Sequence, residues 1–193
     1  MKKILILFAH PALQKSRVNK FLIKGIDKIN GITFHDLYEA YPEMDIDVSY
    51  EQKLLTRHDI IIFHYPFFWY STPAILKEWQ DLVLEHGWAY GHEGVALKDK
   101  LFFNVITTGG KKEAYGNSNF TIRQLLAPIE RTAGLCKMIF LPPYVVHGTY
   151  SITEGEIINH SNHYHEILAL FLENKVDIDK LTTLQYLNEY LEK

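Results

Sequence analysis

Lys2-Lys3-Ile4-Leu5-Ile6-Leu7-Phe8-Ala9 is the stretch that decides the fold of this chain. Its apolar residues follow one another without alternation, and the run stops at the turn His10-Pro11. A continuous apolar run of this kind is typical of a strand covered on both faces, as in a parallel sheet. Residues 59–65 have the same character and stop at Pro66. The two runs therefore predict a parallel sheet between two layers of helices.

The rest of the chain alternates between strand and helix patterns. Three further strands are expected, at residues 32–37, 101–106 and 136–147, the last interrupted by Pro142-Pro143. Apolar residues at helical spacing predict helices over residues 18–29, 49–58, 73–84, 119–133 (ended by Gly134) and 153–172, with a helical tail over residues 179–193. This alternation predicts an α/β three-layer sandwich whose five-stranded parallel sheet has the flavodoxin-like order 2-1-3-4-5. We expect one domain over residues 1–193, with a core over about residues 2–172.

The composition excludes several classes of protein. The chain has 193 residues, of which 47% are hydrophobic and 22% charged, with a formal net charge of −3. These values are those of a globular domain, and they lack the basic excess of a nucleic-acid-binding protein. No apolar run is long enough for a membrane span, so a cytoplasmic protein is expected. The single cysteine, Cys136, excludes an intrachain disulfide and a cysteine-cluster metal site, and no metal site is expected.

The expected topology also locates the site. Ligands of doubly wound sheets bind outside the carboxyl ends of the strands, where the strand order reverses. In this chain that edge is formed by residues 10–19, 65–72 and 107–116. The loops after the first, third and fourth strands are therefore the candidate ligand site.

The first of these loops carries a pattern suited to phosphate. Ser16 and Asn19 are expected in the first turn of a helix, where free backbone amides favour an anion. The loop also supplies positive charge through His10, Lys15 and Arg17. An ordinary helix cap is the alternative interpretation of Ser16.

The other two loops suggest a flat ligand. The second reads Tyr65-Pro66-Phe67-Phe68-Trp69-Tyr70. A surface loop with so many rings predicts either a wall for a planar cofactor or a packed interface. The third reads Thr107-Thr108-Gly109-Gly110, whose glycines allow close approach of the backbone to a ligand. Phosphate donors, rings and exposed backbone together describe a mononucleotide with a flat head, and a flavin fits best.

These loops, together with further motifs, resemble those of a known family, the NAD(P)H:quinone oxidoreductases of the DT-diaphorase type. The resemblance rests on the motifs Ala9-His10-Pro11, Ser16-x-x-Asn19, Pro66-Phe67-Phe68-Trp69-Tyr70-Ser71-Thr72-Pro73-Ala74-Ile75-Leu76-Lys77-x-Trp79, Gly87-Trp88-Ala89-Tyr90-Gly91 and Thr107-Thr108-Gly109-Gly110. It is closest to the bacterial branch that contains the ancillary proteins of glutathione-regulated potassium-efflux antiporters. The resemblance covers about residues 2–172.

The resemblance implies roles for individual residues. Three segments match the family's flavin site: a phosphate loop (His10, Ser16, Arg17, Val18, Asn19), a segment along the isoalloxazine (Phe67, Phe68, Trp69, Tyr70) and a loop at its other side (Thr107, Thr108, Gly109, Gly110). Tyr115 falls where the animal enzymes carry the tyrosine that steadies charge on the reduced flavin. The histidine that accompanies it there is replaced by Thr121 in this chain. His147, after the fifth strand, could also point at the pocket.

The implied activity is a ping-pong transfer of two electrons from NADH or NADPH to a quinone or similar acceptor, with a flavin as cofactor. FMN is expected, because the FAD enzymes of animals are longer at the C-terminus, and FAD remains the alternative. The resemblance also implies a homodimer in which Tyr90, and His92 in place of a usual aromatic residue, cover the partner's flavin. Two other functions stay open. One is a regulatory subunit of a potassium-efflux antiporter at the inner face of the cell membrane, and the other is an electron-transfer flavodoxin.

Overall fold

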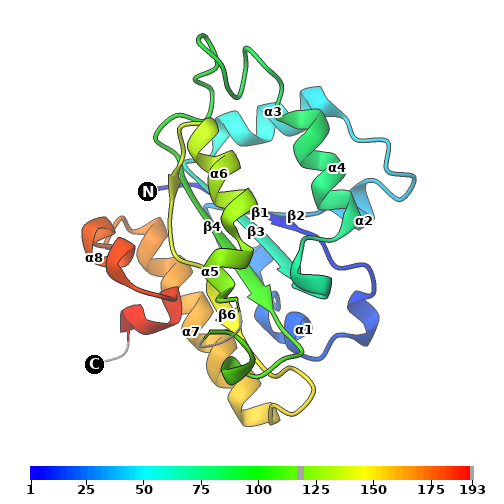
Figure 1. Cartoon of the computed structure of the whole chain (residues 1–193), viewed down its shortest axis with the longest axis vertical. Helices are drawn as coiled ribbons and strands as arrows, with labels where there is room; N and C mark the ends of the chain where they lie inside the picture. Colours follow the sequence, from blue (N-terminus) through cyan, green and yellow to red (C-terminus); the bar gives the residue numbers. More distant parts are fainter. Residues whose placement is uncertain (117–119, 192–193) are drawn as a thin grey trace.

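The computed structural model of the chain describes residues 1–116 and 120–191. A parallel sheet runs through its centre, with helices on both faces (Figure 1). The strand order is β2-β1-β3-β4-β5, and the sixth strand, β6, also pairs with β4. The expected α/β three-layer fold and strand order are confirmed.

The strands explain why the sequence runs decide the fold. They span β1 (Ile4–Phe8), β2 (Ile32–Asp36), β3 (Ile60–Pro66), β4 (Leu101–Thr107), β5 (Ile139–Phe140) and β6 (Tyr144–Val146). Along β1, Leu5 and Leu7 face one helical layer while Ile4 and Ile6 face the other. Both faces are thus buried, which is why β1 is apolar without alternation. The two prolines at 142–143 split the last expected strand into β5 and β6, because proline cannot donate to a ladder.

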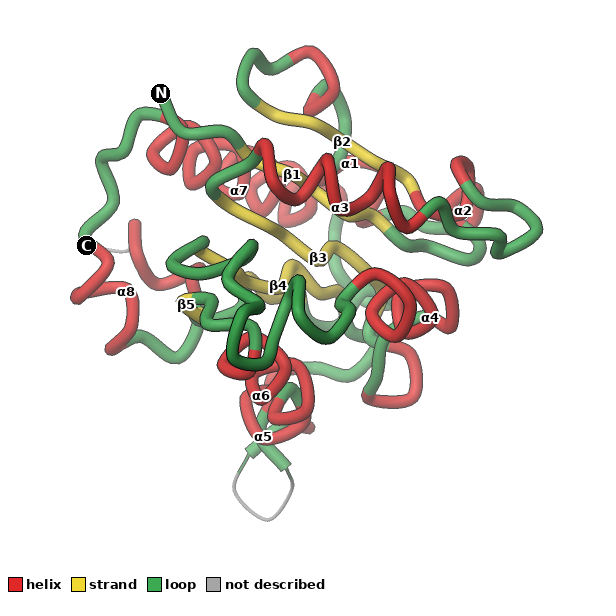
Figure 2. The backbone as a smooth tube through the Cα atoms, turned by 90° about the horizontal axis from the view of Figure 1, so that it is seen from above, coloured by secondary structure: helices red, strands yellow, loops and turns green. Residues whose placement is uncertain are grey.

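Two layers of helices cover the sheet, and Figure 2 shows them on its opposite sides. One layer contains α2 (Leu37–Ala40), α3 (Val48–Arg57), α4 (Ala74–Val83), α5 (Ile122–Leu125) and α6 (Ala127–Leu135). The other contains α1 (Val18–Leu22), α7 (Glu154–Leu172) and α8 (Ile178–Thr183). Short 3-10 turns complete the chain at Leu13–Lys15, Ile26–Lys28, Phe68–Tyr70, Lys112–Ala114 and Leu187–Leu191. Among the described residues, no helix is both long and apolar enough to span a bilayer.

Two expected helix bounds are wrong. The helix expected over residues 18–29 ends at Leu22, and Gly25 then takes a left-handed conformation with φ of 79°. Gly134 does not end the α6 helix, which continues to Leu135. The left-handed residue after α6 is Lys137, with φ of 60°. Apolar spacing misplaced the first end and the preference for glycine after a helix misplaced the second, because neither signal fixes where the backbone reverses.

The C-terminal segment packs against the edge of the sheet beside β6. The backbone N–H of Leu187 donates to the Pro143 carbonyl at 2.9 Å. The Asn188 side chain accepts from the Val145 N–H at 2.8 Å and donates to the Val145 carbonyl at 3.0 Å. One amide side chain therefore makes both hydrogen bonds that a neighbouring strand residue would make. Of the helical tail expected over residues 179–193, the described part contains α8 and the 3-10 turn at Leu187–Leu191, and residues 192–193 lie outside the described residues.

Candidate functional site

A cleft of about 350 Å³ lies at the carboxyl ends of the central strands. Its lining residues come from the loops that follow β1, β3, β4 and β6. These loops lie at the lower end of the sheet in Figure 1. Its walls are formed by His10, Ala12, Lys15, Ser16, Arg17, Val18, Asn19, Pro66, Phe68, Thr107, Gly109, Thr149 and Tyr150. The volume is in the range of small-molecule and cofactor sites. The three loops expected from the topology thus meet at one site.

The loop after β1 forms the cationic end of the cleft. Ser16 Oγ accepts hydrogen bonds from the backbone N–H and the side-chain Nδ2 of Asn19, each at 3.1 Å. Lys15 and Arg17 add positive charge, and Arg17 Nη2 donates to the Ile152 carbonyl at 3.3 Å. The α1 helix has only five residues. The donors of this end are therefore individual side chains and loop amides, and the helix dipole contributes little.

His10 forms part of the cleft wall as a neutral donor. Its Nδ1 accepts the backbone N–H of Ala12 at 3.1 Å, so the proton of the neutral ring is on Nε2. Burial lowers the pKa of the ring, which keeps it neutral. The ring lies edge-on to Phe68, with 6.0 Å between the ring centroids.

Asn19 is the buried centre of a hydrogen-bond network under the cleft. Only 2% of the residue is exposed. Its Nδ2 also donates to Thr107 Oγ1 at 3.0 Å, and its Oδ1 lies 3.1 Å from Nε2 of His64 in β3. The network ties the loop after β1 to β3 and β4, so Asn19 holds the local structure as well as facing the cleft.

The aromatic loop after β3 divides its rings between core and surface. Phe67 is buried in the core, while Phe68 is about half exposed beside the cleft. Trp69 is 93% exposed and Tyr70 59% exposed. Both have left-handed backbones, with φ of 51° and 62°. Such conformations cost roughly 1–3 kcal/mol each and gather at functional sites. Of the four expected flavin contacts, Phe68 lines the cleft, whereas Phe67, Trp69 and Tyr70 are not among its lining residues.

The glycine loop after β4 is packed against two tyrosine rings. A Cβ on Gly109 would lie 2.5 Å from Cε2 of the Tyr150 ring, which covers this residue. A Cβ on Gly110 would lie 3.3 Å from the Tyr115 ring. The sequence reasoning missed Thr149 and Tyr150. They follow β6, and the rule that ligands bind at carboxyl ends would have found them had it been applied to that strand.

Tyr115 has a histidine neighbour, although position 121 is threonine. The rings of Tyr115 and His147 have centroids 5.4 Å apart. Nδ1 of His147 lies 3.1 Å from Oγ1 of Thr108. Burial raises the pKa of Tyr115, and a hydrogen bond with Thr108 opposes that rise. Burial also lowers the pKa of His147 to about 4. His147 thus lies beside Tyr115, but neither residue is among those that line the cleft, and His147 lines another hollow.

Tyr90 and His92 lie away from the cleft of their own chain. They belong to the connection from α4 to β4, at the opposite end of the sheet (Figure 1). Nζ of Lys137 holds this connection by donating to the carbonyls of Gly91 and Gly94. His92 is exposed, and Tyr90 is half-buried against His86. Neither side chain can contact a ligand in the cleft of the same protomer.

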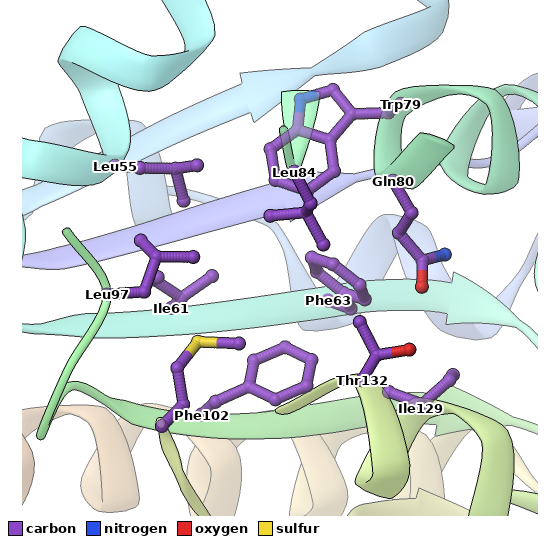
Figure 3. Close-up of a pocket in the computed structure, with 11 residues that line it drawn as sticks. Leu55, Ile61, Phe63, Trp79, Gln80, Leu84, Leu97, Phe102, Ile129 and Thr132 are labelled. Carbon is purple, nitrogen blue, oxygen red and sulfur yellow. The ribbon is translucent and has the colours of Figure 1, made fainter. Parts of the chain in front are cut away.

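Two other hollows are less suited to a flavin. The one in Figure 3 has a free volume of only about 10 Å³. Its lining comes from α3, β3, α4, β4 and α6 and includes Phe63, Trp79 and Phe102, so it is a packing gap in the core. A wider cleft of about 680 Å³ beside His147 is lined by lysines and by three glutamates. That mixture of charges does not favour a phosphate.

Comparison with known proteins agrees with this geometry. The chain is 41% identical over 170 residues to the glutathione-regulated potassium-efflux system ancillary protein KefG of Pectobacterium carotovorum, covering 86% of this chain and 93% of that protein. Among solved structures, general stress protein 14 of Treponema denticola in complex with FMN is 33% identical, with a TM-score of 0.79. The alignment covers 90% of this chain and 99% of that one.

A third relative carries the same fold. An NADPH-quinone reductase from P. pentosaceus is 33% identical, with a TM-score of 0.77, over 86% of this chain and 96% of that chain. These likenesses confirm the resemblance that the sequence motifs indicated. The flavodoxin-like fold family matches residues 2–168, which include every wall of the cleft. The chain belongs to this flavodoxin-like fold family.

Proposed function

We propose that the chain binds FMN in the cleft at the strand ends and acts as an NAD(P)H:quinone oxidoreductase. The observation that carries the proposal is the cleft itself, which Ser16 and Arg17 line together with Phe68 and Gly109. Its support from relatives is the FMN complex of a protein 33% identical to this chain and the NADPH-quinone reductase of equal identity. FMN is preferred to FAD, because the relative from Treponema denticola is described in complex with FMN.

Each wall of the cleft has a role in this proposal. Ser16, Arg17 and the neighbouring Lys15 hold the phosphate, and Val18 and Asn19 shape that end. Phe68 and the backbone of residues 67–70 lie along the isoalloxazine, opposite Gly109 and Gly110. Bound FMN would supply the redox chemistry, accepting a hydride from NADH or NADPH and returning two electrons to a quinone. The protein contributes position and electrostatics.

Tyr115 is proposed to hold a proton beside the reacting ring. Its phenol is kept protonated by burial, so it can donate a hydrogen bond without carrying charge. Thr108 and Gly110 fix the ring position from two sides. A Tyr115→Phe variant should retain the cofactor and lose turnover, and unchanged turnover would remove Tyr115 from the mechanism.

The active site is proposed to be shared between two copies of the chain. Tyr90 and His92 lie at the end of the sheet opposite their own cleft, so only a neighbouring copy can bring them to a flavin. In this arrangement they would contact the nicotinamide and the quinone in turn. If both substrates bind in turn at one place, the kinetics should be ping-pong. Double-reciprocal plots of the initial rate against NADPH at several fixed quinone concentrations would then give parallel lines.

The first experiment is the visible spectrum of the purified protein, followed by mass spectrometry of the released cofactor. A flavin spectrum with released FMN supports the proposal, and a colourless protein that takes up no added FMN contradicts it. NADPH oxidation with menadione then separates an enzyme from an electron shuttle. A mixed dimer of Tyr90→Ala and Ser16→Ala/Asn19→Ala subunits tests the sharing. Activity above that of both parents is expected, and equal activity in verified heterodimers contradicts it.

A second function is favoured by one observation, the 41% identity with an ancillary protein of a potassium-efflux system. In that case the chain would be a cytoplasmic subunit that docks on a potassium-efflux antiporter at the inner face of the membrane. Co-purification with a tagged antiporter from the same cell tests this. Loss of the antiporter from the preparation at native expression levels would argue for a free enzyme.

A further inference from the structure

His64 is a buried histidine in β3 that only partly satisfies its hydrogen-bonding groups. None of its surface is exposed, and it packs edge-on against Phe8 and Tyr164. Nε2 lies 3.1 Å from Oδ1 of Asn19, while Nδ1 has no hydrogen-bond partner among residues 1–116 and 120–191. Burial lowers the pKa of the ring to about 3, so the ring is neutral. The neutral ring therefore carries a single proton, which is bound either to Nδ1 or to Nε2.

The surroundings decide which nitrogen carries that proton. If the proton were on Nδ1, a buried N–H group would have no acceptor, and such groups are rare because they are costly. If the proton is on Nε2, it is donated to Asn19 Oδ1 and only a lone pair of Nδ1 is left unpaired. The second arrangement is favoured, since under-satisfied acceptors are tolerated better than orphaned N–H groups.

The direction of this bond fixes the direction of the bonds that follow. With Oδ1 of Asn19 toward His64, the Nδ2 group points at Ser16 Oγ and Thr107 Oγ1 and donates to both. Ser16 Oγ also accepts the Asn19 backbone N–H, so its two lone pairs are used. Its own hydroxyl proton, like that of Thr107, is then free to point into the cleft. Both hydroxyls face the cleft as donors.

We propose that His64 is a positioning residue that sets the cleft to present hydroxyl donors to an anionic ligand, acting through the amide of Asn19. The proposal rests on the proposed function, because it assigns the donors of Ser16 to the FMN phosphate. It deepens that function by naming what the site selects. A ligand end rich in oxygen lone pairs fits a row of donors, and an end that needs acceptors does not.

The first test does not depend on any ligand. In the protein freed of cofactor, the 15N chemical shifts of the His64 ring distinguish the two neutral forms. We expect Nε2 protonated and Nδ1 unprotonated across pH 5–8, because the structure leaves Nδ1 without a partner. A proton found on Nδ1 would reverse the row of hydrogen bonds and overturn the proposal, whether or not FMN binds.

The second test compares binding of FMN and of riboflavin, which lacks the phosphate. His64→Gln keeps an N–H near the position of Nε2, whereas His64→Met keeps the approximate volume and removes the donor. We expect the FMN affinity of the methionine variant to fall about tenfold while its riboflavin affinity changes by about twofold or less. The glutamine variant should recover most of the FMN affinity.

His58 provides the matched control. It is also a buried histidine, 6% exposed, and lies just before β3 at the other end of that strand. Its two nitrogens bond to the Leu54 carbonyl and to Thr33 Oγ1, away from the cleft. His58→Met should lower the midpoint of thermal unfolding and leave FMN affinity unchanged.

The outcomes separate the two proposals. Equal loss of FMN and riboflavin affinity in His64→Met would show a packing role and contradict the positioning of donors. A native protein that binds neither flavin would refute the proposed function, while the nitrogen shifts would still decide the proton position on His64.

Discussion

Two buried polar networks in this molecule have similar size and opposite design. Glu51 in α3 is fully buried and accepts from Trp79 Nε1 at 2.8 Å and from Tyr41 Oη at 2.6 Å, and it lies 2.7 Å from His35 Nε2. Asn19 has as many side-chain partners, but its network ends at two hydroxyls on the cleft wall. The first network is closed within the protein. The second stays open toward a ligand.

The difference between the two networks indicates which substitutions should lower folding stability and which should lower ligand affinity. A closed network satisfies its members when the chain folds, so breaking it costs folding free energy. An open network keeps hydroxyl donors that have no acceptor within the protein network, so breaking it lowers the affinity for a ligand. Four measurements test this distinction.

The largest effect is expected for Glu51→Ala. The substitution leaves the buried Trp79 N–H and the half-buried Tyr41 hydroxyl without their acceptor, so the free energy of unfolding should fall by about 3 kcal/mol. Urea unfolding measures the change, and FMN affinity of the folded fraction should stay within about twofold of the original value. Glu130→Ala removes an exposed ion pair with Arg123 and serves as control, with an expected loss of about 0.5 kcal/mol. A large loss of FMN affinity with Glu51→Ala would end the distinction.

Ser16→Ala tests the open network. Hydrogen bonds to a charged group contribute about 1.5–3 kcal/mol, so FMN affinity should fall by roughly 10- to 100-fold. Because Asn19 is buried and tied to three elements, adding Asn19→Ala should also destabilise the apoprotein. Ser161→Ala, which removes a hydroxyl bonded to the Phe21 carbonyl, is the matched control. Equal affinities of the Ser16 variant and the native protein, measured by flavin fluorescence, would show that Ser16 is only a cap.

Gly109→Ala tests the packing of the glycine loop against Tyr150. The added Cβ would meet the exposed Tyr150 ring and push it aside, so FMN affinity should fall by about threefold. The double variant with Tyr150→Ala removes the clash and should recover part of that loss if backbone space is what matters. Gly134→Ala, where a Cβ meets nothing within 4 Å, should raise stability slightly without changing affinity.

The smallest effect is a pH dependence of stability. The folded pKa of His147 lies near 4, below the ordinary value of 6.5, so the unfolded chain binds a proton that the folded chain does not. Stability from this residue is complete above pH 6.5 and is lost as the pH falls toward 4. Between pH 7 and pH 6 it should contribute at most about 0.7 kcal/mol. Urea midpoints of His147→Gln should be less sensitive over this interval, and an unchanged slope would contradict the burial.

The layout of the fold could be predicted from the sequence because the strands are buried on both faces. Residues 59–65 and 101–106 are apolar for that reason, and the order of strands followed from their alternation with helices. The ends of helices could not be predicted as well. Gly25 and Lys137 reverse the backbone where apolar spacing continues, and that spacing carries no signal for a positive φ.

The sequence predicted which loops form the candidate site, but it predicted less well which of their side chains are exposed there. The strand-end rule located the residues around Ser16, Thr107 and Gly109 before any coordinates. It could not show that the Phe67 side chain is buried while that of Phe68 is exposed, because two adjacent phenylalanines in one loop are identical in the sequence. His64 could have been predicted to contact a polar side chain, since a histidine inside an apolar strand needs a hydrogen-bond partner.

The Asn188 side chain has a consequence for the exposed edge of the sheet. An uncovered edge strand is a template on which another chain can add, and it is a common route to aggregation. By occupying both backbone groups of Val145, a single amide blocks that route at the centre of the three-residue β6 strand. The blocking residue lies beyond the part of the chain that matches the family, residues 2–168. Relatives that lack such a segment must protect this edge in another way.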